Sequence, residues 1–178
     1  MNHDRTANLL GALALALADS LTHETEMRAE HGAAAPAALV TVGIAPGGSI
    51  DELARILGLS HSATVRLIDR LANDGLVERR GGADGRTAAL YLTRRGRARR
   101  RTVLHGRDRV LAEALDALSG REREALTGLM EAMLGALTSG RRHADHICRL
   151  CDEDVCPGET CPVECAVSRT PGAAELSP

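Results

Sequence analysis

Three arginines and an aspartate surround a glycine-rich stretch, and their spacing suits contact with a polyanion. Arg79 and Arg80 come before the glycines, and Asp84 and Arg86 come at their end. A guanidinium at the tip of a thin hairpin can enter a narrow DNA minor groove, where the negative potential is strongest. Asp84 is close enough in sequence to orient Arg86 through a charge-assisted contact. These residues predict a DNA-contacting tip, against the alternative of solvated arginines on an ordinary surface loop.

A second reactive group lies near the C-terminus, where all five cysteines fall within 18 residues. Cys148 and Cys151 are separated by two residues, a spacing that brings both thiolates to one metal ion. The segment has too few apolar residues to fold alone, so a metal could supply its folding energy. The residues expected to hold this metal are Cys148, Cys151, Cys156, Cys161 and Cys165.

Several readings of the cysteines stay open at this point. Zinc would take four thiolates, or three together with His143 or His146. An iron–sulfur cluster would also take four, and Cys-Pro pairs like those in this chain occur in ferredoxin-type ligand runs. A metal-free thiol switch is the third reading, in which a cysteine of low pKa oxidises and moves the attached helix. An inert tail is the fourth, while the odd number of cysteines argues against structural disulfides.

The elements that must position the arginines can be read from turn and capping residues. Strand-like runs at 76–79 and 87–92 flank the glycines and predict a β-hairpin. Before the hairpin, the pattern predicts a helix from Ile50 to Leu57 and, after Gly58, a second helix from His61 to about Asn73. Ser49 with Glu52, and then Ser60, supply the caps. Helix, short turn, helix and basic hairpin together form a winged helix-turn-helix layout.

In that layout the second helix lies in the major groove and its N-terminal residues meet base edges. Ala63 or Val65 can touch a thymine methyl group, and Arg66 can reach a guanine or a phosphate. Arg70, one turn further on, contacts the DNA backbone or pairs with a neighbouring aspartate. The complete set of expected DNA contacts is Ser62, Ala63, Thr64, Val65, Arg66, Arg70, Asp84 and Arg86.

This part of the chain resembles the MarR family of bacterial transcription regulators. The family's wing signature, Asp-x-Arg-x-x-x-Leu-x-Leu-Thr-x-x-Gly, is present as Asp84, Arg86, Leu90, Leu92, Thr93 and Gly96. The resemblance spans roughly residues 5–140 and implies a homodimer on a pseudo-palindromic operator, usually a repressor released by a small molecule or by oxidation. It also implies that Arg86 enters the minor groove with Asp84 as its orienting partner. The cysteine tail is no part of the family pattern.

Composition supports a mainly helical fold with a small β-hairpin wing, because 44% of the residues are hydrophobic and 1% aromatic. We expect four parts. They are an N-terminal dimerisation helix at 1–35, the winged helix-turn-helix DNA-binding domain at 36–96, C-terminal dimerisation helices at 97–140, and a cysteine-rich tail at 141–178.

Three long helices are expected to flank the DNA-binding domain, at 5–31, 94–118 and 119–137. The first is expected to be buried, through the leucines that recur along it. In a monomer the apolar stripes of these helices would leave much surface exposed, which predicts pairing through the N- and C-terminal helices. Arginines in the first turns of the second helix are expected to face DNA phosphates, although some belong to a solvated face.

The charge distribution, together with the absence of a membrane-spanning run and of catalytic motifs, limits the classes of function that the sequence allows. The net charge is -2, yet from Arg79 to Arg101 there are nine arginines against one acid, which favours a localised polyanion contact. No apolar run approaches the roughly 18–20 residues needed to span a bilayer, so we expect a cytoplasmic protein. Paired carboxylates, a phosphate-cradling loop and a nucleophile elbow are all missing, so we expect no enzyme.

Two alternatives to a cysteine-modulated regulator remain open. One is a regulator whose effector is a hydrophobic small molecule held between the long helices, with a purely structural zinc tail. The other is an enzyme that uses the cysteines, such as a thiol oxidoreductase or a zinc hydrolase. The Cys-x-x-Cys spacing lacks the βαβ setting of thioredoxin-like enzymes, which counts against the oxidoreductase.

Overall fold

The computed structural model describes residues 4–81, 88–156 and 158–169. Over these residues the chain is mainly helical with one two-stranded antiparallel sheet, which confirms the predicted fold class. The described elements, in chain order, are α1 (Arg5–Ala29), α2 (Ala35–Ile44), α3 (Ile50–Leu57), α4 (His61–Asn73), β1 (Val77–Gly81), β2 (Ala88–Leu92), α5 (Arg94–Leu115), α6 (Gly120–Leu137), α7 (Arg141–Cys148) and α8 (Pro162–Arg169).

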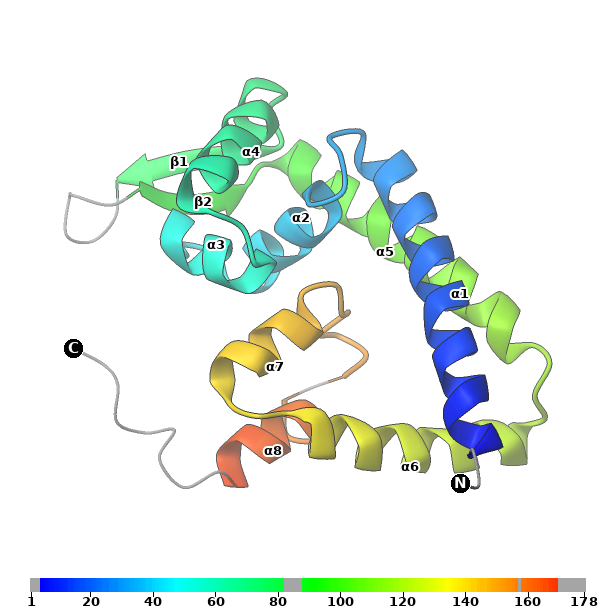
Figure 1. The fold of residues 1–178 in the computed structure, drawn as a ribbon. Helices are drawn as coiled ribbons and strands as arrows, with labels where there is room; N and C mark the ends of the chain where they lie inside the picture. The colour runs from blue at the N-terminus through cyan, green and yellow to red at the C-terminus, as the bar shows by residue number, and fades with distance from the viewer. Residues whose placement is uncertain (1–3, 82–87, 157, 170–178) are drawn as a thin grey trace.

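The helices α2, α3 and α4 pack with the hairpin into the domain drawn from blue to green in Figure 1. Leu39, Leu67, Ile68 and Leu71 are fully or almost fully buried at its centre. Burying such side chains stabilises a fold by about 1.5–3 kcal/mol each. This core fixes the orientation of α4 and of the hairpin relative to each other.

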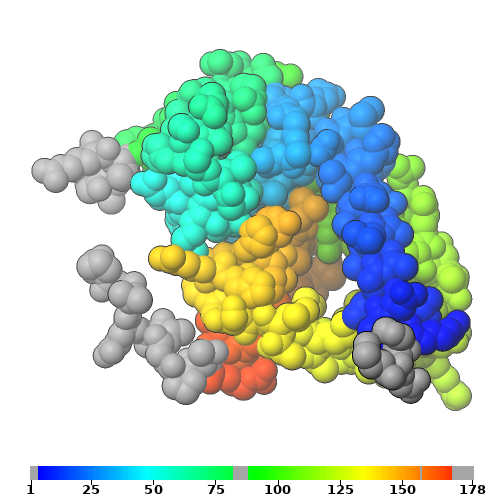
Figure 2. Space-filling view, in the orientation of Figure 1, coloured from blue at the N-terminus to red at the C-terminus, as the bar shows by residue number. Residues whose placement is uncertain are grey.

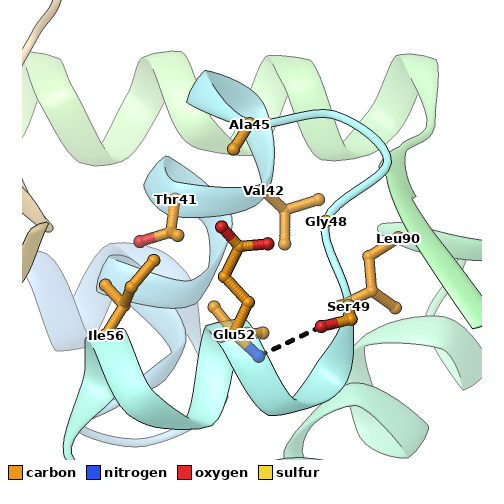
Figure 3. A pocket seen from close by; sticks show the side chains of 9 residues that line it. Thr41, Val42, Ala45, Gly48, Ser49, Glu52, Ile56 and Leu90 are labelled. Carbon is orange, nitrogen blue, oxygen red and sulfur yellow. Dashed lines mark hydrogen bonds between the residues drawn. The ribbon is translucent and has the colours of Figure 1, made fainter. Parts of the chain in front are cut away.

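Local capping sets where α3 and α4 begin. The Ser49 hydroxyl accepts a hydrogen bond from the Glu52 amide at 3.1 Å, and the Ser60 hydroxyl accepts one from the Ala63 amide at 3.2 Å. The predicted capping box at Ser49 is only half formed. Figure 3 shows the Glu52 carboxylate turned away from Ser49, into a pocket that Thr41 also lines.

The wing signature joins the hairpin to α5 through close packing. The Thr93 hydroxyl donates to the Gly75 carbonyl at 2.6 Å and accepts from the Gly96 amide at 3.0 Å. A Cβ at Gly96 would lie 1.9 Å from the Leu76 carbonyl oxygen, so only glycine lets α5 approach the backbone this closely. In the hairpin, Val77 pairs with Leu92 and Gly81 with Ala88.

The long helices differ from the prediction in burial and in one boundary. Helix α1 packs along α5, and α6 leaves the far end of α5 to run below the domain (Figure 1). The prediction of a buried N-terminal helix is wrong for the single chain, because Leu9, Leu10 and Leu13 are 45–51% exposed. Helix α5 ends at Leu115 rather than near residue 118, and the predicted capping box at Ser119 then opens α6.

The cysteine tail, here residues 141–169, packs against the rest of the chain. Helix α7 lies on α3, and α8 lies on α6. Figure 2 shows the tail filling much of the space between α6 and the domain that α2, α3, α4 and the hairpin form. Its small core contains Ala144, Cys161, Val163 and Val167, with Leu134 of α6 against it.

No helix in the described part of the chain is both long enough and apolar enough to cross a membrane.

Candidate nucleic-acid interface and cysteine segment

Helix α4 presents a polar face to solvent beside the hairpin. Ser62, Arg66 and Arg70 are exposed, and neither guanidinium group makes an ion pair or hydrogen bond with any residue that the structure describes. Ala63 and Val65 are half-buried beside them. This face therefore keeps donors free for a ligand outside the chain.

Thr64 departs from the predicted set of DNA contacts. Its side chain is fully buried, and its hydroxyl donates to the Ser60 carbonyl at 3.1 Å. Such a bond within the first turn leaves the threonine facing the core rather than the groove. Thr64 thus supports α4 from inside, and we remove it from the expected contacts.

The base of the hairpin holds its arginines in intramolecular contacts. Arg79 forms an ion pair with Asp69 of α4 at 2.8 Å, which ties the hairpin to that helix. Arg80 stacks over the ring of Tyr91, with its guanidinium carbon 4.3 Å from the ring centroid, and pairs with Glu78. Asp84 and Arg86, the predicted tip, lie outside the described residues.

Several arginines in the first turns of α5 donate hydrogen bonds to backbone carbonyls of neighbouring elements. Arg95 donates to the Asp74 carbonyl at 2.9 Å, Arg97 to the Leu92 carbonyl at 2.9 Å, and Arg99 to the Arg28 carbonyl at 2.8 Å. The expectation that this run faces phosphates stays a prediction. The sequence alone did not reveal these hydrogen bonds, because each acceptor carbonyl belongs to another element or to the strand just before α5.

The thiols of the cysteine segment (residues 148–165) approach one another in pairs. The side chains of Cys148 and Cys151 are hydrogen-bonded, and so are those of Cys156 and Cys161. Cys165 stands apart, with its thiol donating to the Glu159 carbonyl at 3.5 Å. All five are free cysteines.

The predicted metal site depends on how closely the ligand side chains lie to one another. Within the ranges that the structure describes, no three histidine, cysteine or acidic side chains are placed to hold one ion. The predicted histidine ligands are engaged elsewhere, since His146 Nδ1 lies 2.8 Å from the Ile56 carbonyl and His143 contacts Ser139. Paired thiols are present, and metal ligation by the cysteines stays a prediction.

The two thiols of the Cys148–Cys151 pair have pKa values that are shifted in opposite directions. The hydrogen bond from Cys148 lowers the pKa of Cys151 to about 6, with help from Arg107 and Arg149 and against burial. The same hydrogen bond, together with burial, raises the pKa of Cys148. The contact therefore favours the thiolate form on Cys151 over that on Cys148, and the thiolate is the nucleophilic form of a cysteine.

Three contacts that the sequence did not reveal fasten the tail to the DNA-binding domain and α5. Asp145 of α7 pairs with Arg55 of α3 at 2.9 Å, and His146 bonds the Ile56 carbonyl at the end of the same helix. Beyond α7, Glu153 pairs with the largely buried Arg100 of α5 at 3.2 Å. The tail thus contacts α3 directly, through residues that come just before Cys148.

Two cavities lie beside the tail. One of about 360 Å³ is enclosed by α1, α2 and the tail, and Arg107, Arg149 and Cys151 line its polar part. The other, of about 330 Å³, lies between α3 and α7 and is lined in part by Cys148. The two hydrogen-bonded thiols therefore border separate cavities.

Comparison with known proteins agrees with this geometry. Residues 33–87 match the sequence model of the MarR family, which confirms the predicted resemblance. No curated protein sequence matches this chain well enough to count as a relative.

Solved structures of similar fold cover between 70% and 77% of the chain. RV1404 from Mycobacterium tuberculosis is 26% identical, with a TM-score of 0.65 over 77% of this chain and 95% of that one. The apo form of MarR from E. coli is 24% identical, with a TM-score of 0.59 over 70% and 96%. The MarR family protein RV2887 of M. tuberculosis, in complex with p-aminosalicylic acid, is 23% identical, with a TM-score of 0.52 over 70% and 97%.

Proposed function

From the MarR-family match at residues 33–87, we propose that this protein is a transcription regulator that binds duplex DNA as a homodimer. The operator is a pseudo-palindrome, the action is repression, and the protein is not an enzyme. The observation that carries the proposal is the exposed face of α4, where Arg66 and Arg70 are free of any described partner beside the hairpin. Arginine in this position of a recognition helix reads guanine or grips phosphate.

The apolar surface of the long helices supports the dimer. No residue of α6 is buried in the single chain, and Leu129, Met130, Met133 and Leu137 are 41–62% exposed. Large exposed apolar stripes on a protein mark an interface. A two-fold axis through α1 and α6 would place two copies of α4 on successive turns of the same DNA face.

Selection from a randomised duplex library, followed by fluorescence anisotropy, tests the proposal. Full-length protein should bind the selected duplex more weakly as salt rises, because phosphate contacts release counterions. Arg66→Ala and Arg86→Ala should each weaken binding by about 10-fold or more, corresponding to about 1–3 kcal/mol. Arg142→Ala, at an exposed position on α7, is the matched control. If both DNA-face variants bound like wild type, the proposal would fail.

The cysteine tail is proposed to receive the signal. Support comes from its direct contacts with α3, the helix that precedes α4 in the helix-turn-helix. One form of this proposal is a zinc ion or an iron–sulfur cluster held by four of the five cysteines. Metal analysis and the absorption spectrum of protein purified without oxygen test it, because a stoichiometric ion or a brown colour is required.

A second candidate is regulation by a small molecule, with the tail as a structural clasp. It is favoured by the cavity of about 360 Å³, whose wall of alanine, leucine and proline side chains is joined by Arg107 and Arg149. Such a lining suits an apolar ligand that carries a carboxylate. Titration with aromatic carboxylates such as p-aminosalicylic acid, read as release of DNA, tests this candidate.

A further inference from the structure

We propose that Cys148 and Cys151 form a dithiol–disulfide couple that exchanges with small anionic disulfides, and that its oxidation changes how the tail packs on α3. The regulatory part of this inference rests on the proposed DNA-binding function. The chemical part concerns the two thiols alone and can be tested without DNA.

The backbone between the two cysteines already has the shape that a disulfide requires. The Cys151 amide donates to the Cys148 carbonyl at 2.9 Å, which closes a tight turn just after α7. Such a turn keeps its end Cα atoms within about 7 Å, and disulfides join Cα atoms roughly 4.4–6.8 Å apart. The two thiols are also in hydrogen-bond contact. A sulfur–sulfur bond can therefore close without unwinding α7.

The surroundings select the kind of oxidant. Cys151 faces the cavity of about 360 Å³, and the guanidinium groups of Arg107 and Arg149 line the same cavity. Both arginines favour a reagent that carries carboxylates, and the volume admits one arm of a small disulfide. Among the other thiols, Cys161 is buried and Cys165 bonds to a backbone carbonyl.

The exchange takes place in two balanced steps. The Cys151 sulfur attacks one sulfur of the small disulfide, so a mixed disulfide forms and one small thiolate leaves and takes up the Cys151 proton. The Cys148 sulfur then attacks the Cys151 sulfur, so the protein disulfide forms and the second small thiol leaves with the Cys148 proton. Two protein thiols lose two electrons and two protons, and one small disulfide becomes two small thiols.

The turn between the cysteines connects the tail to the main core. Leu150, inside the turn, packs against the core of the DNA-binding domain, whereas Ile147 and Cys148 pack in the core of the tail. Drawing the sulfurs from hydrogen-bond contact to a bond of about 2.05 Å shifts one of these groups against the other. The nearest contacts to α3 are those of Asp145 and His146, so they carry the change toward the DNA-binding face.

The test uses the full-length protein, reduced and purified without oxygen, in buffers of reduced and oxidised glutathione. After alkylation of free thiols, peptide mass spectrometry measures each cysteine, and anisotropy with the selected duplex measures binding. We expect a Cys148–Cys151 disulfide that forms reversibly with a single midpoint potential, and at least about a 5-fold change in DNA affinity across it.

Variants make the assignment specific. Cys148→Ser should trap a glutathione adduct on Cys151, because the second sulfur is missing, and Ser168→Ala, at an exposed site on α8, should behave like wild type. The chemical inference is overturned if no 148–151 disulfide forms at the oxidising end, if the adduct collects on another cysteine, or if the thiols are protected by a stoichiometric metal. A disulfide with unchanged DNA affinity overturns the regulatory part, whereas reduced protein that binds no duplex refutes the proposed function instead.

Discussion

Gly96 allows the start of α5 to pack directly against the backbone that leads into the hairpin. Its neighbour Thr93 caps α5 and bonds back to the Gly75 carbonyl, so α5 begins against the chain that enters the hairpin. There is no space for a side chain, because a Cβ would meet the Leu76 carbonyl oxygen at 1.9 Å. The two nearest atoms belong to the Leu76 backbone, which cannot move aside as a flexible side chain can.

We therefore expect Gly96→Ala to destabilise the protein by at least about 1–3 kcal/mol, the range for overpacked sites. Gly128→Ala is the matched control, because a Cβ at that helical position meets nothing within 4 Å. The control should be neutral or stabilising by up to about 1 kcal/mol. Chemical denaturation at equal protein concentration gives both values, and equal stabilities for the two variants would contradict the argument.

Arginine is the residue type whose role sequence predicted least well. A local excess of positive charge marks the hairpin and the start of α5 as a candidate interface, yet Arg79 bonds to Asp69, and Arg95 to the Asp74 carbonyl. Each contact joins elements that only the folded chain brings together. By contrast, the caps at Ser49, Ser60 and Ser119 involve neighbours within three residues, and the sequence located all three helix starts.

At the scale of elements, α7 and α8 are held to each other by an ion pair that the sequence did not predict. Arg141 at the start of α7 donates to both carboxylate oxygens of Glu164 in α8, at 2.6 and 2.7 Å. This bidentate contact lowers the pKa of Glu164. A carboxyl whose pKa is lower in the folded than in the unfolded state stabilises the fold at pH values above its unfolded pKa.

The stabilisation by Glu164 should therefore be present near neutral pH and be lost as the pH falls through its folded pKa, below the ordinary value of 4.5. Both side chains are more than a third exposed, so the effect should stay below about 1 kcal/mol. Thermal unfolding of wild type and Glu164→Gln should differ at pH 7 and converge at low pH. Glu124→Gln, at an exposed site on α6, should match wild type throughout.

The whole molecule is arranged so that a single chain leaves its longest helices only partly covered. Leucines along the first half of α1 and the stripe on α6 are exposed, whereas α2, α3, α4 and the hairpin share a buried core with parts of α1 and α5. Leucine periodicity in the sequence marks a face to be covered but does not say by which chain, so the burial expected for α1 is not found in the single chain. The packing of the tail on α3 was beyond that reasoning, since it depends on Arg55, Asp145 and His146 meeting across the fold.

If a second copy covers α6, then a charge on its apolar stripe should separate the subunits. Leu129→Glu places a carboxylate where the leucine is 62% exposed in the single chain and apolar contact is expected in the dimer. Sedimentation velocity should show a monomer, and affinity for the selected duplex should fall by about 100-fold or more, because the second half-site is no longer tethered. Gly128→Glu, on the opposite face of α6 at a position where an added Cβ meets nothing within 4 Å, should remain a dimer with wild-type affinity. A Leu129→Glu variant that stays dimeric would move the interface away from α6, and one that is monomeric yet binds DNA at full strength would show that each subunit acts alone.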